Sequence, residues 1–455
     1  MLAESPGHVL ALLRGRDGRS DEGVLVDAAL DPDFMTILLA AIGERRRYRG
    51  GRGELRGVPD RTFKSARGGN GPLTATPIGS EQSNSSVAFG DRIILKLYRA
   101  LEHGINPDLE IGRFLTARGF GAVPAVCGAL EYLAADGSRS VAAIAQQFVA
   151  NQGDVFTYTL DSLGDYLERA VAEGPPPPVG PLTAAGLLAA STEELPLIAN
   201  RTVGSYVDLA RQLGVRTGEL HAVLASETRD PAFAPEPFTE HYQRSVYQSI
   251  HTLSRQNLRL LGRVAESLPP GAAHDAKMVL ASYGTVDTRL RALLSHRFGG
   301  QRIRVHGDFH AGQVLHTGRD LVIIDFEGEP ARPLSERRLK RSALRDVAGM
   351  IRSFHYAAYG SLLHPGLGPS VREEDAPALE PWVRAWYRWA SAAYLGGYRE
   401  ATAGEAFLPA DAGEWATVLD AMLFHKAFYE LGYELNNRPD WVAIPLRGIA
   451  QLLEP

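Results

Sequence analysis

The stretch VHGDFHAGQVLHTGRDLVIIDFE, residues 305–327, places acidic side chains and histidines around two short apolar runs. Asp308 stands between two histidines, and Asp325 directly follows the apolar run LVII. A buried charge is costly unless it has a partner, because it loses its hydration. The stretch therefore predicts that these acids face a metal ion or a substrate, and the rest of the chain decides which.

The spacing of three polar residues in this stretch is typical of a phosphoryl-transfer site. Asp308 and Gln313 are five positions apart, and Asp325 comes after a hydrophobic strand. In such sites the first acid orients and deprotonates the attacking hydroxyl, while an amide oxygen and a second acid hold Mg²⁺ ions that bridge the nucleotide phosphates. Hard oxygen ligands suit Mg²⁺. The sequence thus predicts Asp308 as the catalytic base and Gln313 and Asp325 as metal ligands.

Two alternatives stay open for the HGDFH segment. His306, Asp308 and His310 could bind Zn²⁺ as in a metallohydrolase, since imidazole and carboxylate are zinc ligands. That hypothesis does not account for Gln313, and no second cluster of His or Cys stands out in the sequence. The other alternative is a turn whose polar groups are satisfied within the protein.

Upstream, residues 76–149 predict a small antiparallel sheet with one inserted helix. The runs VAFG and RIILKLY read as strands joined at Gly90-Asp91, which is a hairpin signal. A helix then opens with a capping Asn106 followed by a proline. Two further strand-like runs, VPAVCGALEYL and VAAIAQQFVANQGD, complete the sheet.

This sheet supplies groups that a nucleotide site needs. Lys96 ends the run RIILK, so its ammonium can reach phosphates, and Glu110 on the following helix can pair with Lys96 and fix its position. The turn SEQSNSS, residues 80–86, can cover phosphates with small residues and backbone N–H groups, although it lacks a G-x-G-x-x-G pattern. Each signal is weak alone, and the order in which they precede Asp308 and Asp325 gives them weight.

Beyond Gly153 the pattern is helical, apart from a proline-rich loop at 174–186. Strands first and helices after predict an α+β protein with two lobes. We expect a cap subdomain over 1–75, a nucleotide-binding sheet lobe over 76–149, and a helical lobe with the catalytic loop and acceptor site over 150–455. The arginines of 45–56 are either a polyanion patch or a solvated helix end and loop, and the interrupting Gly and Glu favour the second.

The bulk composition is that of an ordinary globular protein. Of 455 residues 45% are hydrophobic and 22% are charged, and the net charge of −5 argues against nucleic-acid and membrane partners. The single Cys127 rules out an intrachain disulfide and fits a reducing compartment. We find no signal-peptide pattern and no apolar run of membrane-spanning length. These observations predict a cytoplasmic protein.

With these motifs in place, the chain resembles the protein-kinase-like superfamily in its aminoglycoside-phosphotransferase branch. HGD…Q stands where protein kinases have H-R-D…N, and Asp325-Phe326-Glu327 stands where they have D-F-G. More closely, the chain resembles the bacterial maltokinases, especially the kinase portion of trehalose synthase–maltokinase fusions. The segments that carry this resemblance lie in order over 79–447: GSEQSNSSVAFGDRIILKLYR, NPDLEIGRFL, FVANQGDVFTYTLDSL, VHGDFHAGQVL, VIIDFEGEPARPLSERRLKRSALRDVAGMIRSFHYAAY and KAFYELGYELNNRPDWVAIPL.

The resemblance implies ATP-dependent phosphorylation of maltose at its anomeric hydroxyl, giving maltose 1-phosphate for α-glucan synthesis, with ATP and Mg²⁺ as cofactors. By the family pattern Asp308 is the base, Gln313 and Asp325 hold Mg²⁺, Lys96 meets the phosphates and Glu110 positions Lys96. The further nucleotide-site assignments are Ser83, Asn84 and Ser85 at the phosphates and Gln147, Phe148 and Val149 at the adenine.

We expect the helix at 424–437 to form one wall of the acceptor site. Its polar face combines carboxylates, which accept from sugar hydroxyls, with an aromatic ring that can pack on a pyranose. One departure from the family is His425, where an acidic residue often precedes the lysine. The acceptor-site assignments are His306, Glu327, Lys426, Glu430, Tyr433, Glu434 and Arg438.

Other interpretations differ in acceptor or in activity. A relative within the same group phosphorylates glucosamine, and an antibiotic kinase is a further alternative, although a cationic acceptor calls for more carboxylates than this helix offers. A non-catalytic binding module is disfavoured because Lys96, Asp308 and Asp325 are all present. The fused relatives imply a separate trehalose synthase as a partner. The basic tract 332–345 stands where protein kinases have an activation loop. It is either a structural loop or a regulatory one that is phosphorylated at Ser335 or Ser342.

Overall fold

The computed structural model describes residues 9–14, 22–69, 71–80, 84–364, 367 and 374–454. The chain divides into two compact units. The sheet unit contains Met1–Ala150 and Asp325–Arg338, and the helical unit contains Asn151–Ile324 and Leu339–Pro455. The expected α+β class, with an antiparallel sheet and a helical C-terminal part, is confirmed.

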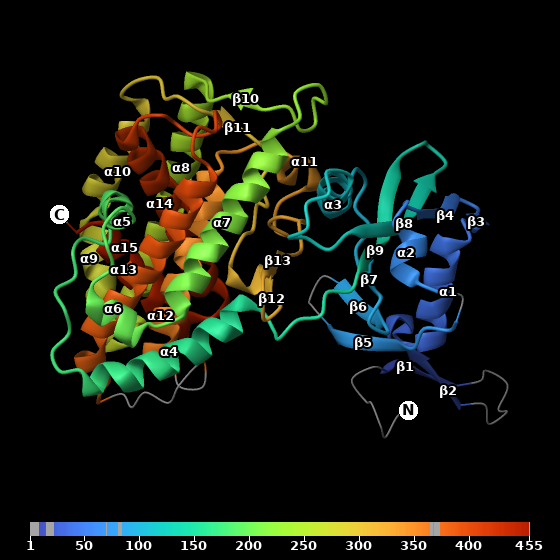
Figure 1. Ribbon diagram of the computed structural model, residues 1–455, viewed down its shortest axis with the longest axis horizontal. Helices are drawn as coiled ribbons and strands as arrows, with labels where there is room; N and C mark the ends of the chain where they lie inside the picture. The colour runs from blue at the N-terminus through green and yellow to red at the C-terminus, as the bar shows by residue number, and fades with distance from the viewer. Residues whose placement is uncertain are drawn as a thin grey trace. The chain divides into compact units, whose positions relative to one another are not determined.

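A seven-stranded antiparallel sheet forms the centre of the sheet unit (Figure 1), with the strand order β3-β4-β8-β9-β7-β6-β5. The predicted hairpin joins β6 to β7 through Gly90, whose φ of +55° suits a residue without a Cβ. The strand bounds are β3 Arg47–Gly50, β4 Gly53–Pro59, β5 Ala75–Ser80, β6 Asn84–Phe89, β7 Ile93–Tyr98, β8 Val126–Ala134 and β9 Arg139–Gln147.

Three helices accompany this sheet: α1 (Pro32–Gly43), α2 (Phe63–Arg67) and α3 (Pro107–Ala117). A Cβ at Gly57 of β4 would overlap the carbonyl of Ala41, so the glycine lets α1 lie directly on the strand. Helix α3 begins as predicted, because the side chain of Asn106 accepts a hydrogen bond from the backbone N–H of Asp108 at 2.8 Å.

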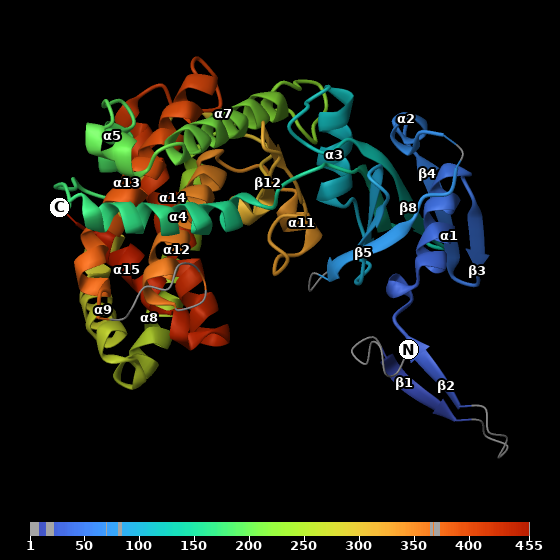
Figure 2. The same ribbon diagram turned by 60° about the horizontal axis from the view of Figure 1, so that its bottom comes forward.

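The structure differs from the expected division at two places. Strand β4, which lies in the expected cap, joins the central sheet, because it pairs along its whole length with β8, from Gly53↔Ala134 to Pro59↔Gly128. The hairpin of β1 (Val9–Arg14) and β2 (Glu22–Val26) does form its own two-stranded sheet (Figure 2). The segment Asp325–Arg338, with the short helix α11 (Leu334–Arg337), belongs to the sheet unit and not to the helical one.

The helical unit is built around long helices that pack closely. Helices α7 and α13 lie side by side, since a Cβ at Gly214 would overlap the carbonyl of Tyr394 and one at Gly397 would overlap the carbonyl of Arg211. Within the described residues, no helix combines the length and apolar character needed to cross a bilayer. The helix bounds are α4 Val155–Ala172, α5 Ala184–Ala190, α6 Leu197–Thr202, α7 Tyr206–Ala225, α8 Glu240–Val264, α9 Pro270–Ala281, α10 Tyr283–Arg291, α12 Leu344–Leu363, α13 Ala376–Ala401, α14 Ala412–Asn437 and α15 Ala443–Leu452.

Short strands and one turn of 3₁₀ helix frame the loop that carries Asp308. The turn η5 (Ala311–Gln313) is followed by β12 (Val314–His316), which pairs antiparallel with β13 (Leu321–Ile323). Before the loop, β11 (Gln301–Arg302) pairs with β10 (Glu236–Pro237). The first three residues of the run LVII therefore form the expected strand, which ends two residues before Asp325.

Candidate active site

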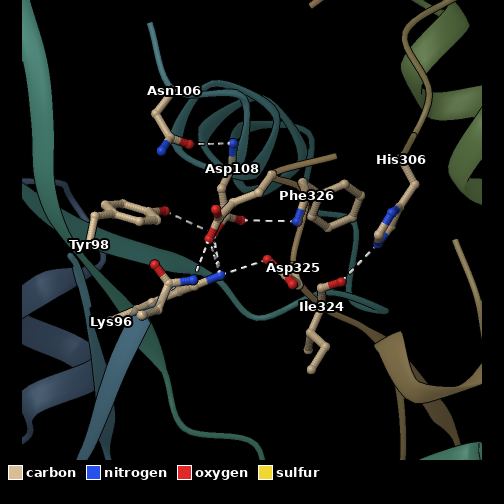
Figure 3. Close-up of polar contacts among 10 residues, drawn as sticks. Lys96, Tyr98, Asn106, Asp108, His306, Ile324, Asp325 and Phe326 are labelled. Atoms are coloured by element: carbon tan, nitrogen blue, oxygen red, sulfur yellow. Dashed lines mark hydrogen bonds and ion pairs between the residues drawn. The ribbon is translucent and has the colours of Figure 1, made fainter. Parts of the chain in front are cut away.

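In the sheet unit, one buried lysine faces three carboxylates. The Nζ atom of Lys96 lies 2.6 Å from Asp325 Oδ1, 2.5 Å from Glu327 Oε1 and 3.5 Å from Asp108 Oδ2. Figure 3 shows Asp108 and Asp325 converging on this ammonium from helix α3 and from the chain after β13. We call these four residues the lysine cluster, and its formal charge, one positive against three negative, is −2.

Burial and mutual attraction act against each other in the lysine cluster. Burial is the largest effect on Lys96 and lowers its pKa, but Asp108, Asp325 and Glu327 together hold that pKa well above its ordinary value. For Glu327 burial raises the pKa, the neighbouring Asp325 and Asp108 raise it further, and Lys96 does not fully compensate. The cluster carries more negative charge than its lysine neutralises, which favours the approach of another cation.

The acid that α3 presents to Lys96 is Asp108, so the expected pairing of Lys96 with Glu110 is wrong. The Asp108 carboxylate also accepts from the Tyr98 hydroxyl at 3.1 Å and from the backbone N–H of Phe326 at 3.2 Å. Glu110 instead receives both branches of the Arg338 guanidinium, at 3.0 and 2.7 Å. Two positions along a helix turn the side-chain direction by about 200°, so the two acids leave α3 on opposite sides.

Asp325 has a left-handed backbone conformation, with a φ of +65°. Among the described residues Arg45 is the other non-glycine residue with positive φ. Aspartate tolerates this region better than most residues do. The conformation turns the chain between Ile324 and the buried Phe326, so that the Asp325 carboxylate points to Lys96.

Part of the segment predicted as a phosphate-binding turn is a strand, because Asn84 and Ser85 belong to strand β6. Both side chains are buried: the Asn84 amide donates to Glu327 Oε1 at 2.7 Å, and the Ser85 hydroxyl accepts from Arg99 at 3.1 and 3.2 Å. Ser83 lies outside the described residues. Asn84 is thus placed to orient Glu327, and a direct role at phosphates stays a prediction.

The predicted adenine-binding segment follows the end of β9. The backbone N–H of Gln147 donates to Ala125 at 2.8 Å, and that of Phe148 donates to Arg92 at 2.9 Å. These two donors are therefore used within the sheet, and the next residue, Val149, begins the extended connection to the helical unit. The role of this segment at adenine stays a prediction.

In the helical unit, Asp308 forms an ion pair with Lys426 of α14. The Lys426 Nζ atom lies 3.2 Å from Asp308 Oδ1, and both side chains keep about a quarter of their surface exposed, at 24% and 23%. Burial, the largest effect, raises the pKa of Asp308, but Lys426, His310 and His306 outweigh it and lower that pKa to about 2. Asp308 is accordingly ionised at neutral pH and open enough to meet a ligand.

The loop around Asp308 is anchored by α12. The buried carboxylate of Asp346 accepts from the backbone N–H groups of His306 at 2.7 Å and Gly307 at 3.0 Å. His221 of α7 lies 3.2 Å from the same carboxylate. These bonds fix the backbone of the two residues that precede the predicted base.

The same loop is tied to the strand end that precedes Asp325. The His306 ring nitrogen Nε2 lies 2.9 Å from the carbonyl of Ile324 (Figure 3), and the backbone N–H of Ile324 donates to the carbonyl of Gln313 at 3.0 Å. His306 is buried, at 1% exposure, so the structure supports a positioning role for it more than the predicted contact with the acceptor.

The predicted acceptor wall on α14 is only partly as expected. Tyr433 is 44% exposed, and the guanidinium of Arg438 lies 5.4 Å from the centre of its ring. Glu430 and Glu434, by contrast, are buried at 8% and 1% exposure and are bound by Arg352 and Arg438 respectively. Because arginines already bind both carboxylates, a direct role for Glu430 and Glu434 at sugar hydroxyls stays a prediction.

Four residues of the two candidate regions, one in the sheet unit and three in the helical unit, were missed by the sequence interpretation. Asp108 carried a signal, as an acid in the first turn of a capped helix, and so did Tyr429, three positions after Lys426 and with its ring centre 5.2 Å from the Lys426 Nζ. Asp346 and Arg352 gave no local signal beyond being charged residues in an apolar helix. Their roles depend on contacts with segments far away in the sequence.

No protein-family profile matches the chain as a whole or in part. The glucosamine kinase of Mycolicibacterium smegmatis is 23% identical over 382 residues, covering 83% of this chain and 79% of the relative. The glucosamine kinase of Streptacidiphilus jiangxiensis is 29% identical over 247 residues, covering 54% of this chain and 49% of the relative.

A solved glucosamine kinase in complex with glucosamine, ADP and inorganic phosphate has the same fold as this chain. It superimposes with a TM-score of 0.65 at 20% identity, covering 98% of this chain and 94% of that one. The chain therefore has the protein-kinase-like fold. The relatives support a phosphotransferase of the sugar-kinase type, and they give no support to maltokinase in particular.

Proposed function

We propose that the protein is an ATP-dependent kinase that phosphorylates a hydroxyl group of a small sugar. The observation that carries this proposal is Asp308, a carboxylate that Lys426 keeps ionised on a loop fixed by Asp346. The order Asp308, Gln313, Asp325, preceded by a buried lysine, is the order of the corresponding groups in protein kinases. The relatives with a nucleotide-dependent sugar chemistry support the same assignment.

In the proposed reaction, Asp308 orients the acceptor hydroxyl and takes its proton. The hydroxyl oxygen forms a bond to the γ-phosphorus, the bond from that phosphorus to the bridging β–γ oxygen breaks, and ADP leaves. A carboxyl group with a pKa of about 2 is a weak base, so orientation is the larger part of its role. Displacement of Lys426 by the acceptor would raise that pKa and strengthen the base.

The donor set of the lysine cluster fits a divalent cation. Carboxylate oxygens of Asp108, Asp325 and Glu327 lie within 4.8 Å of one another, and oxygen ligands of this kind suit Mg²⁺. We propose that Asp325 and Gln313 hold Mg²⁺ and that Lys96 binds nucleotide phosphates. When bound, the metal ion neutralises charge on the transferred phosphoryl group. Chelation of Mg²⁺ by EDTA is therefore expected to abolish turnover.

Glucosamine is the acceptor that the relatives favour, and we propose it as the first candidate. Maltose, the acceptor expected from the sequence, is the second candidate because of one observation. The ammonium of Lys426 stands beside the base, and the two carboxylates of α14 are already bound by arginines. This setting favours a neutral sugar, or an amino sugar whose nitrogen lies away from Lys426.

A panel of acceptors tests the proposal. ADP release from ATP is measured with glucosamine, N-acetylglucosamine, glucose and maltose, with and without Mg²⁺. The proposal expects one sugar to stimulate ADP release at least tenfold above the rate without acceptor, and N-acetylglucosamine separates a requirement for the free amine from one for the sugar ring. Absence of stimulation by every sugar of the panel would contradict a sugar kinase.

A separate trehalose synthase stays a proposed partner. This proposal depends entirely on maltose being the acceptor. Glucosamine as the sole acceptor would remove its rationale. Independent elution of the two purified proteins from a sizing column at micromolar concentration would count against a stable complex.

A further inference from the structure

Two buried polar contacts join α12 to α14. The Arg352 guanidinium reaches Glu430 Oε2 with Nε at 2.8 Å and Nη2 at 2.7 Å. The Tyr356 hydroxyl donates to Glu434 Oε1 at 2.7 Å. Residues 352 and 356 are one turn apart on α12, as are residues 430 and 434 on α14, so the contacts are successive rungs between the helices.

Because the Arg352–Glu430 and Tyr356–Glu434 contacts are buried, a gain in folding stability does not readily explain their presence. Arg352 and Glu434 each have 1% of their surface exposed, and Glu430 has 8%. Burial, the largest effect, lowers the pKa of Arg352, but Glu430 raises it above its ordinary value. A buried ion pair often contributes no more stability than an apolar pair of similar volume, although removal of one partner alone is strongly destabilising. A positional role is the remaining explanation.

The neighbouring face of α12 holds the loop that carries Asp308. Asp346 binds the loop at the backbone of His306 and Gly307, and the Ser353 hydroxyl accepts from the backbone N–H of Ala311 at 3.1 Å. Asp346 and Ser353 are seven positions apart and share one side of the helix. One helix thus holds the loop of Asp308 on one side and α14 on another.

The position of α14 sets where Lys426 stands relative to Asp308. Glu430 is one turn from Lys426 and next to Tyr429, so the rung at Glu430 fixes the rotation of α14 about its own axis. Rotation of α14 would move both Lys426 and the ring of Tyr429. A displacement of about 1 Å at a site of this kind can cost roughly 10²-fold in rate.

We propose that Arg352 and Tyr356 are positioning residues that hold the acceptor wall of α14 in register with Asp308. This inference rests on the proposed sugar-kinase function. It gives Glu430 and Glu434 a different role from the predicted one. They bind α12 through Arg352 and Tyr356 and thereby position α14, and they do not themselves bind the sugar. Lys426, Tyr429 and Tyr433 then form the surface that meets the acceptor.

The first experiment is a double-mutant cycle on the Arg352–Glu430 rung. Arg352→Met and Glu430→Met are each expected to raise the acceptor KM about tenfold or more while the KM for ATP changes less than about twofold, because lost acceptor placement appears in that KM. The double variant restores an apolar pair, and its acceptor KM is expected within about threefold of the wild type. A double variant as impaired as Glu430→Met would show that Glu430 binds the sugar and would overturn the proposal.

Three further variants separate positioning from general stability. Tyr356→Phe removes one hydroxyl and is expected to raise the acceptor KM less than the arginine change. Gly448→Ala of α15 places a Cβ on the Arg352 guanidinium and disturbs the rung without altering either partner. The control is Arg384→Met, which breaks the partly exposed pair with Glu454 and is expected to leave the acceptor KM unchanged. Parallel changes in the acceptor KM of all three would indicate a merely structural role.

Hydrogen exchange gives a measurement that needs no substrate. In Arg352→Met, amide exchange in the peptide covering 424–437 is expected to accelerate at least tenfold relative to the same peptide in Arg384→Met. Unchanged exchange in that peptide would overturn the positioning role. Failure of the acceptor panel, with accelerated exchange, would overturn the sugar-kinase function and leave the positioning role standing.

Discussion

The lysine cluster of the sheet unit and the Asp308–Lys426 pair of the helical unit both combine lysine with carboxylates, but their charge balances differ. In the cluster three carboxylates surround one ammonium. In the pair one carboxylate faces one ammonium, with His306 and His310 close enough to lower its pKa further. The cluster is left with excess negative charge, whereas in the pair one positive charge balances one negative charge.

This difference shows that the neighbours of a buried group decide whether it stays ionised. Burial alone would neutralise an isolated acid or base. In the cluster, the carboxylates keep Lys96 charged, and their remaining negative charge favours the binding of one more cation. In the pair, Lys426 keeps Asp308 charged, and the part-exposed carboxylate can accept a hydrogen bond from a neutral hydroxyl. Substitution of single residues in the lysine cluster and in the Asp308–Lys426 pair tests this comparison.

The largest effect is expected from Asp308→Asn. The change preserves the shape of the side chain but removes its charge, which both orients the acceptor hydroxyl and allows it to lose its proton, so turnover is expected to fall by roughly 10²–10⁴-fold. Nucleotide affinity, measured by titration calorimetry, is expected to stay near the wild-type value. A variant that keeps more than about a tenth of the wild-type turnover would remove Asp308 from this role.

Lys96→Met is expected to affect stability as well as activity. It leaves three carboxylates without their cation, and loss of one partner from a buried ion pair costs about 3–5 kcal/mol of unfolding free energy. Millimolar Mg²⁺ is expected to raise the Tm of this variant more than that of the wild type, because the metal ion can replace the ammonium. Equal Mg²⁺ responses in thermal melts would argue against a cation site in the cluster.

Lys426→Met is expected to move the acid limb of the pH profile. The folded-state pKa of Asp308, about 2, lies below its ordinary value of 3.8. The ionised Asp308 therefore stabilises the folded protein above pH 3.8, and this contribution to the free energy of unfolding is lost as the pH falls towards 2. Without Lys426, burial is opposed mainly by the histidines and the pKa rises. We expect the acid limb of kcat/KM to shift upward by about one unit or more, and an unshifted limb would contradict the pairing.

The smallest effect is expected from Glu110→Gln, and its contrast with Asp108→Asn is informative. Glu110 pairs with the partly exposed Arg338, so its loss is expected to cost about 0.2–1 kcal/mol and to leave the KM for ATP unchanged. Asp108→Asn removes charge next to Lys96 and is expected to raise the KM for ATP severalfold. Reversal of this order in steady-state kinetics would restore Glu110 as the partner of Lys96.

The sequence was sufficient for the features that depend on local chemistry. The Asn106 cap, the Gly90 hairpin and the strand before Asp325 all form as predicted, because each follows from a few adjacent residues. The order of Lys96, Asp308 and Asp325 likewise identified a phosphotransferase. The relatives now support that coarse assignment.

The errors arose where three-dimensional context decides. Which acid of α3 meets Lys96 depends on how the helix is rotated about its axis relative to β7, and periodicity within α3 cannot give that rotation. The interpretation of α14 placed Glu430 and Glu434 on a polar face that meets the acceptor, yet both are buried against α12. Their partners, Arg352 and Tyr356, come from 78 residues earlier in the chain.

The assignment of Asp325–Arg338 to the sheet unit also limits how the gene can be divided. The polypeptide passes from one unit to the other after Ala150, after Ile324 and after Arg338. A fragment ending at Ala150 would contain Lys96 and Asp108 but neither Asp325 nor Glu327, and would leave an ammonium with one of its three acids. Expression of the two units as separate polypeptides would therefore require residues 325–338 to be joined to the first fragment by a linker.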